Sequence, residues 1–108
     1  MSTSCRIAIK LPNGSYRSVY CYFDGYEDRV GKILNQNYAT EDAANWLINL
    51  GDLRLLSHKT IEFFLKDNHR QIGPTLSRSP TELSILAFEE DCVDYLYVFE
   101  DGIWEVHQ

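Results

Sequence analysis

The chain has 108 residues, of which 44% are hydrophobic and 13% aromatic, and its formal net charge at pH 7 is −6. This length suits a single domain covering residues 1–108, and the composition excludes a disordered chain. No stretch approaches the roughly 18 apolar residues that a membrane span needs, so we expect a soluble, cytoplasmic protein without membrane contact.

The first predicted element is a β-hairpin over about residues 5–23. Apolar and polar residues alternate up to Leu11, and a Pro-Asn-Gly turn signal follows. Two registers are open: a two-residue turn buries the tyrosines beside the aliphatic residues, whereas a three-residue loop with Gly14 in the left-handed conformation separates them. We favour the three-residue loop, because it places Ile7 opposite Val19 and gathers the aliphatic side chains on one face.

Two amphipathic helices are predicted next, over about residues 26–38 and 40–50. Asp24 and Glu27 have the spacing of a capping box before the first helix. Thr40 is the predicted N-cap of the second, which is followed by a glycine in the C′ position. The two helices are expected to form a helical hairpin.

A third helix is predicted over about residues 80–90. Ser79 fits its N-cap and Pro80 its first helical position. Acids at the C-terminal end of this helix oppose the helix dipole, which indicates that they serve another purpose. Residues 52–78 carry mixed signals and support no firm prediction.

The last predicted element is a second hairpin over about residues 92–107. A three-residue loop that begins at Glu100 would place Leu96 with Trp104 on an apolar face, as in the first hairpin. We therefore predict an α+β fold, in which an antiparallel sheet built from the two hairpins packs its aliphatic face on about three helices.

The opposite face of this sheet is predicted to be aromatic. Large exposed apolar patches mark interaction sites, and aromatic residues are common interface hot spots. Three interpretations are open: the middle segment covers this face, a partner protein or a second copy binds it, or it stacks nucleic-acid bases, which the negative net charge disfavours. The predicted partner-binding residues are Tyr16, Tyr20, Tyr22, Tyr95, Tyr97 and Phe99.

Acidic residues are concentrated near the C-terminal end of the sequence. Residues 80–108 contain eight Asp and Glu and no Lys or Arg, whereas residues 1–79 contain all ten basic residues and eight acids. Such a field steers a cationic partner and disfavours phosphate, although a merely solvated acidic surface is the alternative. The predicted steering residues are Glu89, Glu90, Asp91, Asp94, Glu100, Asp101 and Glu105.

No catalytic residue, metal site or cofactor is predicted. The three histidines lie in no recognised metal, nucleophile or phosphate-binding motif. Cys5, Cys21 and Cys92 are widely separated and lack the spacing of a zinc site, and Cys21 is expected to be a core thiol. An enzyme with an unrecognised site is the alternative.

Residues 5–56 contain a hairpin ending in a Tyr-Cys-aromatic-Asp-Gly-Tyr run, then a Val-Gly helix and a Leu-Gly-Asp turn. With the closing stretch DYLYVFEDGIWEV, they resemble a family of small proteins encoded by phages, prophages and plasmids. The family's Arg-Asp-Arg-Gly-like middle stretch is absent here. By analogy, the resemblance implies a small acidic protein that acts in the host cytoplasm by binding and inhibiting or modulating a host or defence protein. The matching positions are Tyr20, Cys21, Asp24, Gly25, Tyr26, Gly31, Gly51 and Asp52.

Overall fold

The structure, a computed structural model, describes residues 3–57, 59–63 and 73–108. Its elements in chain order are β1 (Cys5–Lys10), β2 (Tyr16–Cys21), η1 (Glu27–Gly31), α1 (Lys32–Asn37), α2 (Glu41–Asn49), β3 (Leu53–Leu56), β4 (Ile61–Phe63), β5 (Thr75–Ser77), α3 (Pro80–Ser84), η2 (Ile85–Glu90), β6 (Tyr95–Glu100) and β7 (Ile103–His107). The π-helical turns η1 and η2 are continuous with α1 and α3, so the three predicted helices are confirmed to within one residue at each end. Within the described ranges, no helix has the length and apolar character required to cross a membrane.

The described strands form one mixed sheet of seven strands. Its order is β4-β3-β2-β1-β6-β7, and β5 pairs with β2. The predicted hairpins are β1–β2 and β6–β7, both antiparallel, and they join through the parallel pair β1–β6, which sets Ile7 beside Tyr97. The α+β class is confirmed and most strand pairs are antiparallel. The two parallel pairs, β1–β6 and β2–β3, were not predicted, nor were the three strands between residues 52 and 78.

The favoured register of the first hairpin is confirmed. Ile7 lies opposite Val19, and the backbone N–H of Leu11 donates to the carbonyl oxygen of Ser15 at 2.7 Å. Gly14 has a φ of 87°, the left-handed conformation that the last position of this three-residue loop requires. Ile7, Ile9 and Val19 therefore share one face of the sheet.

The predicted loop of the second hairpin is wrong. Phe99 lies opposite Trp104, so the loop contains only Asp101 and Gly102. Their φ angles, 53° and 80°, are the positive values that the two central positions of a type I′ turn require and that an Asp-Gly pair favours. Trp104 therefore lies on the face of Phe99 and not on the face of Leu96.

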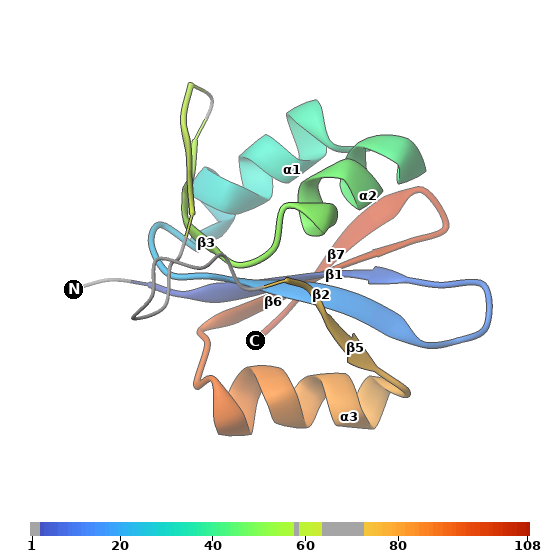
Figure 1. The fold of residues 1–108 in the computed structure, drawn as a ribbon. Coiled ribbons are helices and arrows are strands. Elements are labelled where there is room, and N and C mark those ends of the chain that lie inside the picture. Colours follow the sequence, from blue (N-terminus) through green and yellow to red (C-terminus); the bar gives the residue numbers. More distant parts are fainter. Residues whose placement is uncertain (1–2, 58, 64–72) are drawn as a thin grey trace.

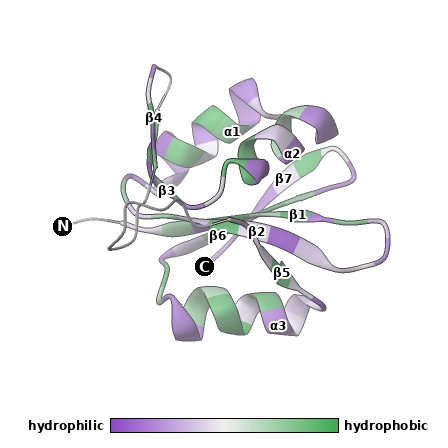
Figure 2. Cartoon of the chain, in the orientation of Figure 1, coloured by the Kyte–Doolittle hydropathy of each residue, from purple (hydrophilic) through white to green (hydrophobic). Residues whose placement is uncertain are grey.

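Helices cover both faces of the sheet (Figure 1): α1 and α2 lie on one face, and α3 lies on the other. The larger core packs the first pair of helices against β1, β2 and β6. The smaller core packs Leu83 and Ala87 of the third helix against Ala8 and Leu96. Hydrophobic and hydrophilic residues alternate along each helix (Figure 2), as expected of helices that bury a single stripe. The molecule therefore has three layers.

The predicted aromatic surface is not formed. Tyr97 and Phe99 are 2% and 3% exposed, in the larger core beside Ile7. Tyr16 is 5% exposed, in the smaller core with Leu83. There are two causes. The third helix packs on the face that was expected to be open and covers Tyr16. The orientation of β6 directs Tyr97 and Phe99 toward α1 and α2. These three side chains are therefore not available for base stacking or for a partner.

Two of the three predicted helix starts are confirmed. The side chains of Thr40 and Ser79 each accept a hydrogen bond from the backbone N–H three residues later, at 3.2 and 3.1 Å. The predicted Asp24–Glu27 capping box is wrong, because the helix begins after Tyr26 without a side-chain cap and Asp24 has a φ of 59°. In this conformation Asp24 forms the corner between β2 and η1.

Tyr97 connects the sheet to that corner. Its hydroxyl donates to the carbonyl oxygen of Gly25 at 2.7 Å. Its ring packs against Gly31, where an added Cβ would lie 3.1 Å from a ring carbon. Burial raises the pKa of the Tyr97 phenol, so the hydroxyl stays protonated and donates.

We expect Tyr97→Phe to lower the free energy of unfolding by about 1–2 kcal/mol, because the buried Gly25 carbonyl loses its donor. Chemical denaturation of the two proteins measures this difference. The matched control is Tyr26→Phe, because Tyr26 is 42% exposed and its change should cost less than about 0.5 kcal/mol. Equal losses in both variants would contradict a structural role for the Tyr97 hydroxyl.

Candidate partner-binding surface

The described part of the chain contains one histidine and three cysteines. His107 is exposed, with its Nε2 4.0 Å from a carboxylate oxygen of Glu105, and the other two histidines lie outside the described residues. Cys5 and Cys21 face each other as buried thiols, which confirms the predicted core position of Cys21. Burial raises the pKa of Cys5, which keeps this thiol protonated. Within residues 3–57, 59–63 and 73–108, no three His, Cys, Asp or Glu side chains gather as a metal site.

One charged side chain is buried between the sheet and the end of η2. Arg6 is 3% exposed, its Nη1 lies 2.7 Å from Asp91 Oδ2, and its Nε donates to the Ser18 hydroxyl at 2.8 Å. Burial lowers the pKa of Arg6, and the charges of Asp91 and Asp52 oppose that shift. The ion pair explains why an acid follows this helix against its dipole. Asp91 therefore serves the fold.

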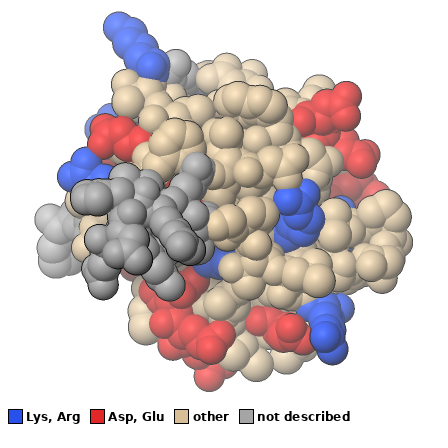
Figure 3. Space-filling model, in the orientation of Figure 1, with Lys and Arg blue, Asp and Glu red and all other residues tan. Residues whose placement is uncertain are grey.

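The other predicted steering residues lie at the surface. Asp94 accepts a hydrogen bond from the backbone N–H of Ser4 at 3.2 Å, and Glu100 pairs with Lys10 at 3.3 Å. The exposed members are Glu89, Glu90, Asp94, Asp101 and Glu105. Acidic side chains gather near the third helix, at the bottom of Figure 3, and near the start of α2, at its upper right. Steering by these residues stays a prediction.

Only part of the predicted aromatic set reaches the surface. Tyr22 is 37% exposed, and Tyr20 and Tyr95 are half-buried. Tyr20 packs at the margin of the smaller core and Tyr95 at the margin of the larger one, so they lie on opposite faces of the sheet. The structure therefore does not bring the six predicted residues together on one surface.

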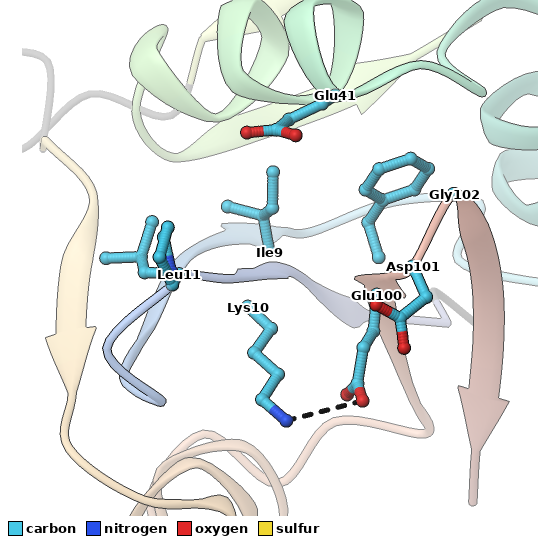
Figure 4. Close-up of a pocket in the computed structure, with 9 residues that line it drawn as sticks. Ile9, Lys10, Leu11, Glu41, Glu100, Asp101 and Gly102 are labelled. Carbon is cyan, nitrogen blue, oxygen red and sulfur yellow. Dashed lines mark hydrogen bonds and ion pairs between the residues drawn. The ribbon is translucent and has the colours of Figure 1, made fainter.

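A hollow of about 430 Å³ lies where the β1–β2 and β6–β7 turns approach the start of α2. In Figure 4, Glu41 points from α2 toward Ile9, and Lys10 and Glu100 reach toward each other on the other side of the strands. The hydrogen bond with Glu100 raises the pKa of Lys10. With Asp101 also lining it, the hollow has three carboxylates against one ammonium group. This charge favours a cationic group in the hollow.

The strand β7 is a border of the sheet, and β6 is its only neighbouring strand among the described residues. Ile103 and Val106 on this strand are 62% and 38% exposed. A border strand carries backbone groups that can pair with another chain, and charged residues commonly protect it. Exposed aliphatic residues on β7 instead favour contact with another molecule.

A groove of about 130 Å³ separates β7 from the helix formed by η1 and α1. Its apolar lining comes from Trp104, Val106 and Tyr97. Its polar lining includes Glu27 and Lys32 from the helix. The groove therefore runs beside the border strand and offers an apolar surface between two charged side chains.

An aromatic pair, Tyr38 and Trp46, is linked to the same strand through Trp104. Trp46 is 55% exposed, and its ring stacks on Tyr38 with the planes 10° apart and the centroids at 6.3 Å. The indole Nε1–H of Trp104 donates to the Tyr38 carbonyl oxygen at 2.8 Å, which ties the pair to β7. Sequence reasoning missed Trp46, although it lies between Ala44 and Leu47 of the buried stripe and so falls on the outer side of α2.

The residues that carried the family resemblance mainly maintain the fold. Gly51 has a φ of 89° directly after α2, as predicted for a C′ glycine, and the Asp52 carboxylate accepts from the backbone N–H of Tyr20 at 2.9 Å. Gly31 allows the close contact with the Tyr97 ring, and Gly25 allows the close approach of Ser4 and Cys5. No family model matches the chain, and searches of curated proteins and of solved structures returned no significant match.

Proposed function

We propose that this protein acts without chemistry of its own, by binding another protein and inhibiting or modulating it. The observation that carries this proposal is the border strand β7, which pairs on one side only among the described residues and exposes Ile103 and Val106. Bare sheet borders and exposed aliphatic side chains together are typical of surfaces that another chain covers.

The proposed contact area is the β7 surface, which comprises β7, the adjoining groove, and the Tyr38–Trp46 pair. Tryptophan is the residue most enriched among interface hot spots, because it contributes a large area at low entropic cost. The acids of the last third of the chain would orient a basic partner before contact.

The proposed partner is a protein of the host cell or of its defence machinery, met in the host cytoplasm. This choice follows the resemblance to proteins of phages, prophages and plasmids. The small size and acidity of the chain are in keeping with an inhibitor that acts in a stoichiometric complex.

The test is to capture the partner from host lysate, identify it by mass spectrometry, purify it, and titrate it against variants of this protein. We expect Trp46→Ala and Ile103→Ala each to weaken binding by about tenfold or more, since each removes an exposed apolar contact. The matched control is Ile85→Ala, in η2 and outside the β7 surface, because Ile85 is 42% exposed and should not affect binding.

Stoichiometry separates this function from catalysis. A binder saturates its effect at a fixed ratio of protein to partner. Full effect on the partner at a small fraction of that ratio, with turnover of a substrate, would contradict the proposal. If Ile85→Ala weakens binding as much as Trp46→Ala does, the partner contacts a surface other than the β7 surface.

A further inference from the structure

The β6–β7 hairpin determines which backbone groups of β7 face outward. Glu100 and Ile103 flank the two-residue turn, and flanking residues of such a turn form a hydrogen-bonded pair. The pattern alternates along an antiparallel ladder, so Trp104 and Val106 stand in non-hydrogen-bonded pairs with β6. Their N–H and C=O groups are therefore directed away from β6, to the border of the sheet.

We propose, resting on the proposed function, that the partner supplies an extended segment that adds to β7 as a further antiparallel strand. In strand addition, main-chain hydrogen bonds provide affinity and alternate side chains provide specificity. Antiparallel pairing is the more stable arrangement per residue. The residues of the segment that bond to Trp104 and Val106 then direct their side chains to the same face as these two.

That face contains the groove beside η1 and α1, which selects an aliphatic side chain. The groove has about 130 Å³ lined in part by Trp104, Val106 and Tyr97. A cavity of about 150 Å³ can hold a molecule the size of benzene, so the groove suits one aliphatic side chain. The side chains of Lys32 and Glu27, which also line the groove, carry opposite charges, so together they favour neither a cationic nor an anionic side chain in it.

The other face of the added strand meets Glu105. The side chain of Glu105 is exposed, and its Oε2 lies 4.0 Å from Nε2 of His107. Opposite charges directly across two strands stabilise a pair, whereas like charges destabilise it. The segment therefore carries Lys or Arg opposite Glu105, alternating with the aliphatic residues that face the groove.

The same charge argues against a second copy of this chain as the occupant. The register that pairs Trp104 of each copy with Val106 of the other uses all four outward groups of each strand. It also places Glu105 directly opposite Glu105 of the second copy, at a Cα separation of about 4.5 Å. This like-charge contact disfavours the homodimer, so a basic segment of another protein is the occupant.

The test uses a nine-residue synthetic peptide of alternating Val and Lys, added to the ¹⁵N-labelled protein and followed by NMR. We expect the amide signals of Trp104 and Val106 to shift and to become protected from hydrogen exchange. Methylating the backbone nitrogens of the Val residues should weaken binding by about tenfold or more, because these N–H groups pair with β7. Methylating those of the Lys residues should leave binding unchanged, because they face solvent.

Two variants of the protein provide the reciprocal test. Val106→Pro removes one outward N–H and no bond to β6, and proline is tolerated on border strands, so we expect a folded protein that binds the Val/Lys peptide about tenfold more weakly. Glu105→Lys should weaken binding of the Val/Lys peptide, because the charges then repel, and should allow a peptide of alternating Val and Glu to bind. Exchange protection of the β6 amides checks the fold of both.

Several outcomes would overturn strand addition: unchanged Trp104 and Val106 amides, loss of binding on methylating the Lys residues instead, or a wild-type dimer that Val106→Pro converts to monomer. Failure of strand addition is distinguishable from failure of the proposed function. If Trp46→Ala weakens binding of the captured partner but Val106→Pro does not, the β7 surface is supported as the binding site and the added strand is ruled out.

Discussion

Gly25→Ala is expected to lower the free energy of unfolding by about 3 kcal/mol, or to prevent folding. A Cβ on Gly25 would lie 2.8 Å from the carbonyl carbon of Ser4 and 2.9 Å from the Cβ of Cys5. Ser4 directly precedes β1 and Cys5 begins it, so neither atom can turn aside as the end of a flexible side chain would. The backbone N–H of Gly25 also donates to Thr3 at 2.8 Å, and a shift of the corner would break this bond.

A graded series of glycine substitutions is the control, measured by denaturant unfolding of each variant. Gly31→Ala should cost less than Gly25→Ala, because the added Cβ would lie 3.1 Å from the Tyr97 ring while alanine favours the helix. Gly73→Ala should be close to neutral, since nothing lies within 4 Å of the added Cβ. Similar losses at positions 25 and 73 would refute the steric explanation.

The second large effect concerns the buried cation. Arg6→Ala is expected to cost about 3 kcal/mol, because it leaves a cavity and removes the partner of Asp91 and of the fully buried Ser18. This loss of stability is at the low end of the range for a broken buried ion pair, because the Asp91 side chain is 28% exposed and water can hydrate it. Thermal or chemical unfolding measures the loss.

Arg6→Met separates the charge from the volume. Methionine fills most of the space but does not replace the guanidinium at Asp91 and Ser18, so we expect a loss of about 2 kcal/mol, smaller than that of Arg6→Ala. In a double-mutant cycle, Asp91→Asn should destabilise the wild-type protein more than the Arg6→Met variant. Additive losses would show that the 2.7 Å ion pair contributes nothing to stability.

The first hairpin and the helices were predictable because local residues decide them. Gly14 adopts the positive φ that its loop needs, and Ser79 and Thr40 cap the helices they precede. Such requirements involve neighbours in the sequence only, so they can be recognised without knowledge of the rest of the fold.

The second hairpin was not predictable from its pattern, because both faces of β6 are apolar. Leu96 and Val98 pack under the third helix, and Tyr97 and Phe99 pack under the first two. A strand covered on both faces has no alternation that fixes its register. The Asp-Gly pair at the turn was the better indicator, and it favours the two-residue loop that the structure has.

The candidate surface depends on strand order, which the sequence does not reveal. That β7 lies at the border follows from the pairing of β1 with β6, two strands far apart in the chain. Trp46 was recoverable, since helical periodicity places it on the outer side of α2. Its link to β7 becomes visible only in the structure, where its ring stacks on Tyr38 and Trp104 donates to the Tyr38 carbonyl oxygen.

The adjacency of β1 and β6 also bears on how the chain matures during translation. Ile7 leaves the ribosome 90 residues before Tyr97, the residue it lies beside in the finished sheet. Until then the inner edge of β1 is bare, and Ile7 and Ile9 lack the aromatic rings that complete their packing. Contacts of such long range slow folding and expose strand edges to aggregation. In the nascent chain, β1 can therefore complete its packing only after β6 has been synthesised.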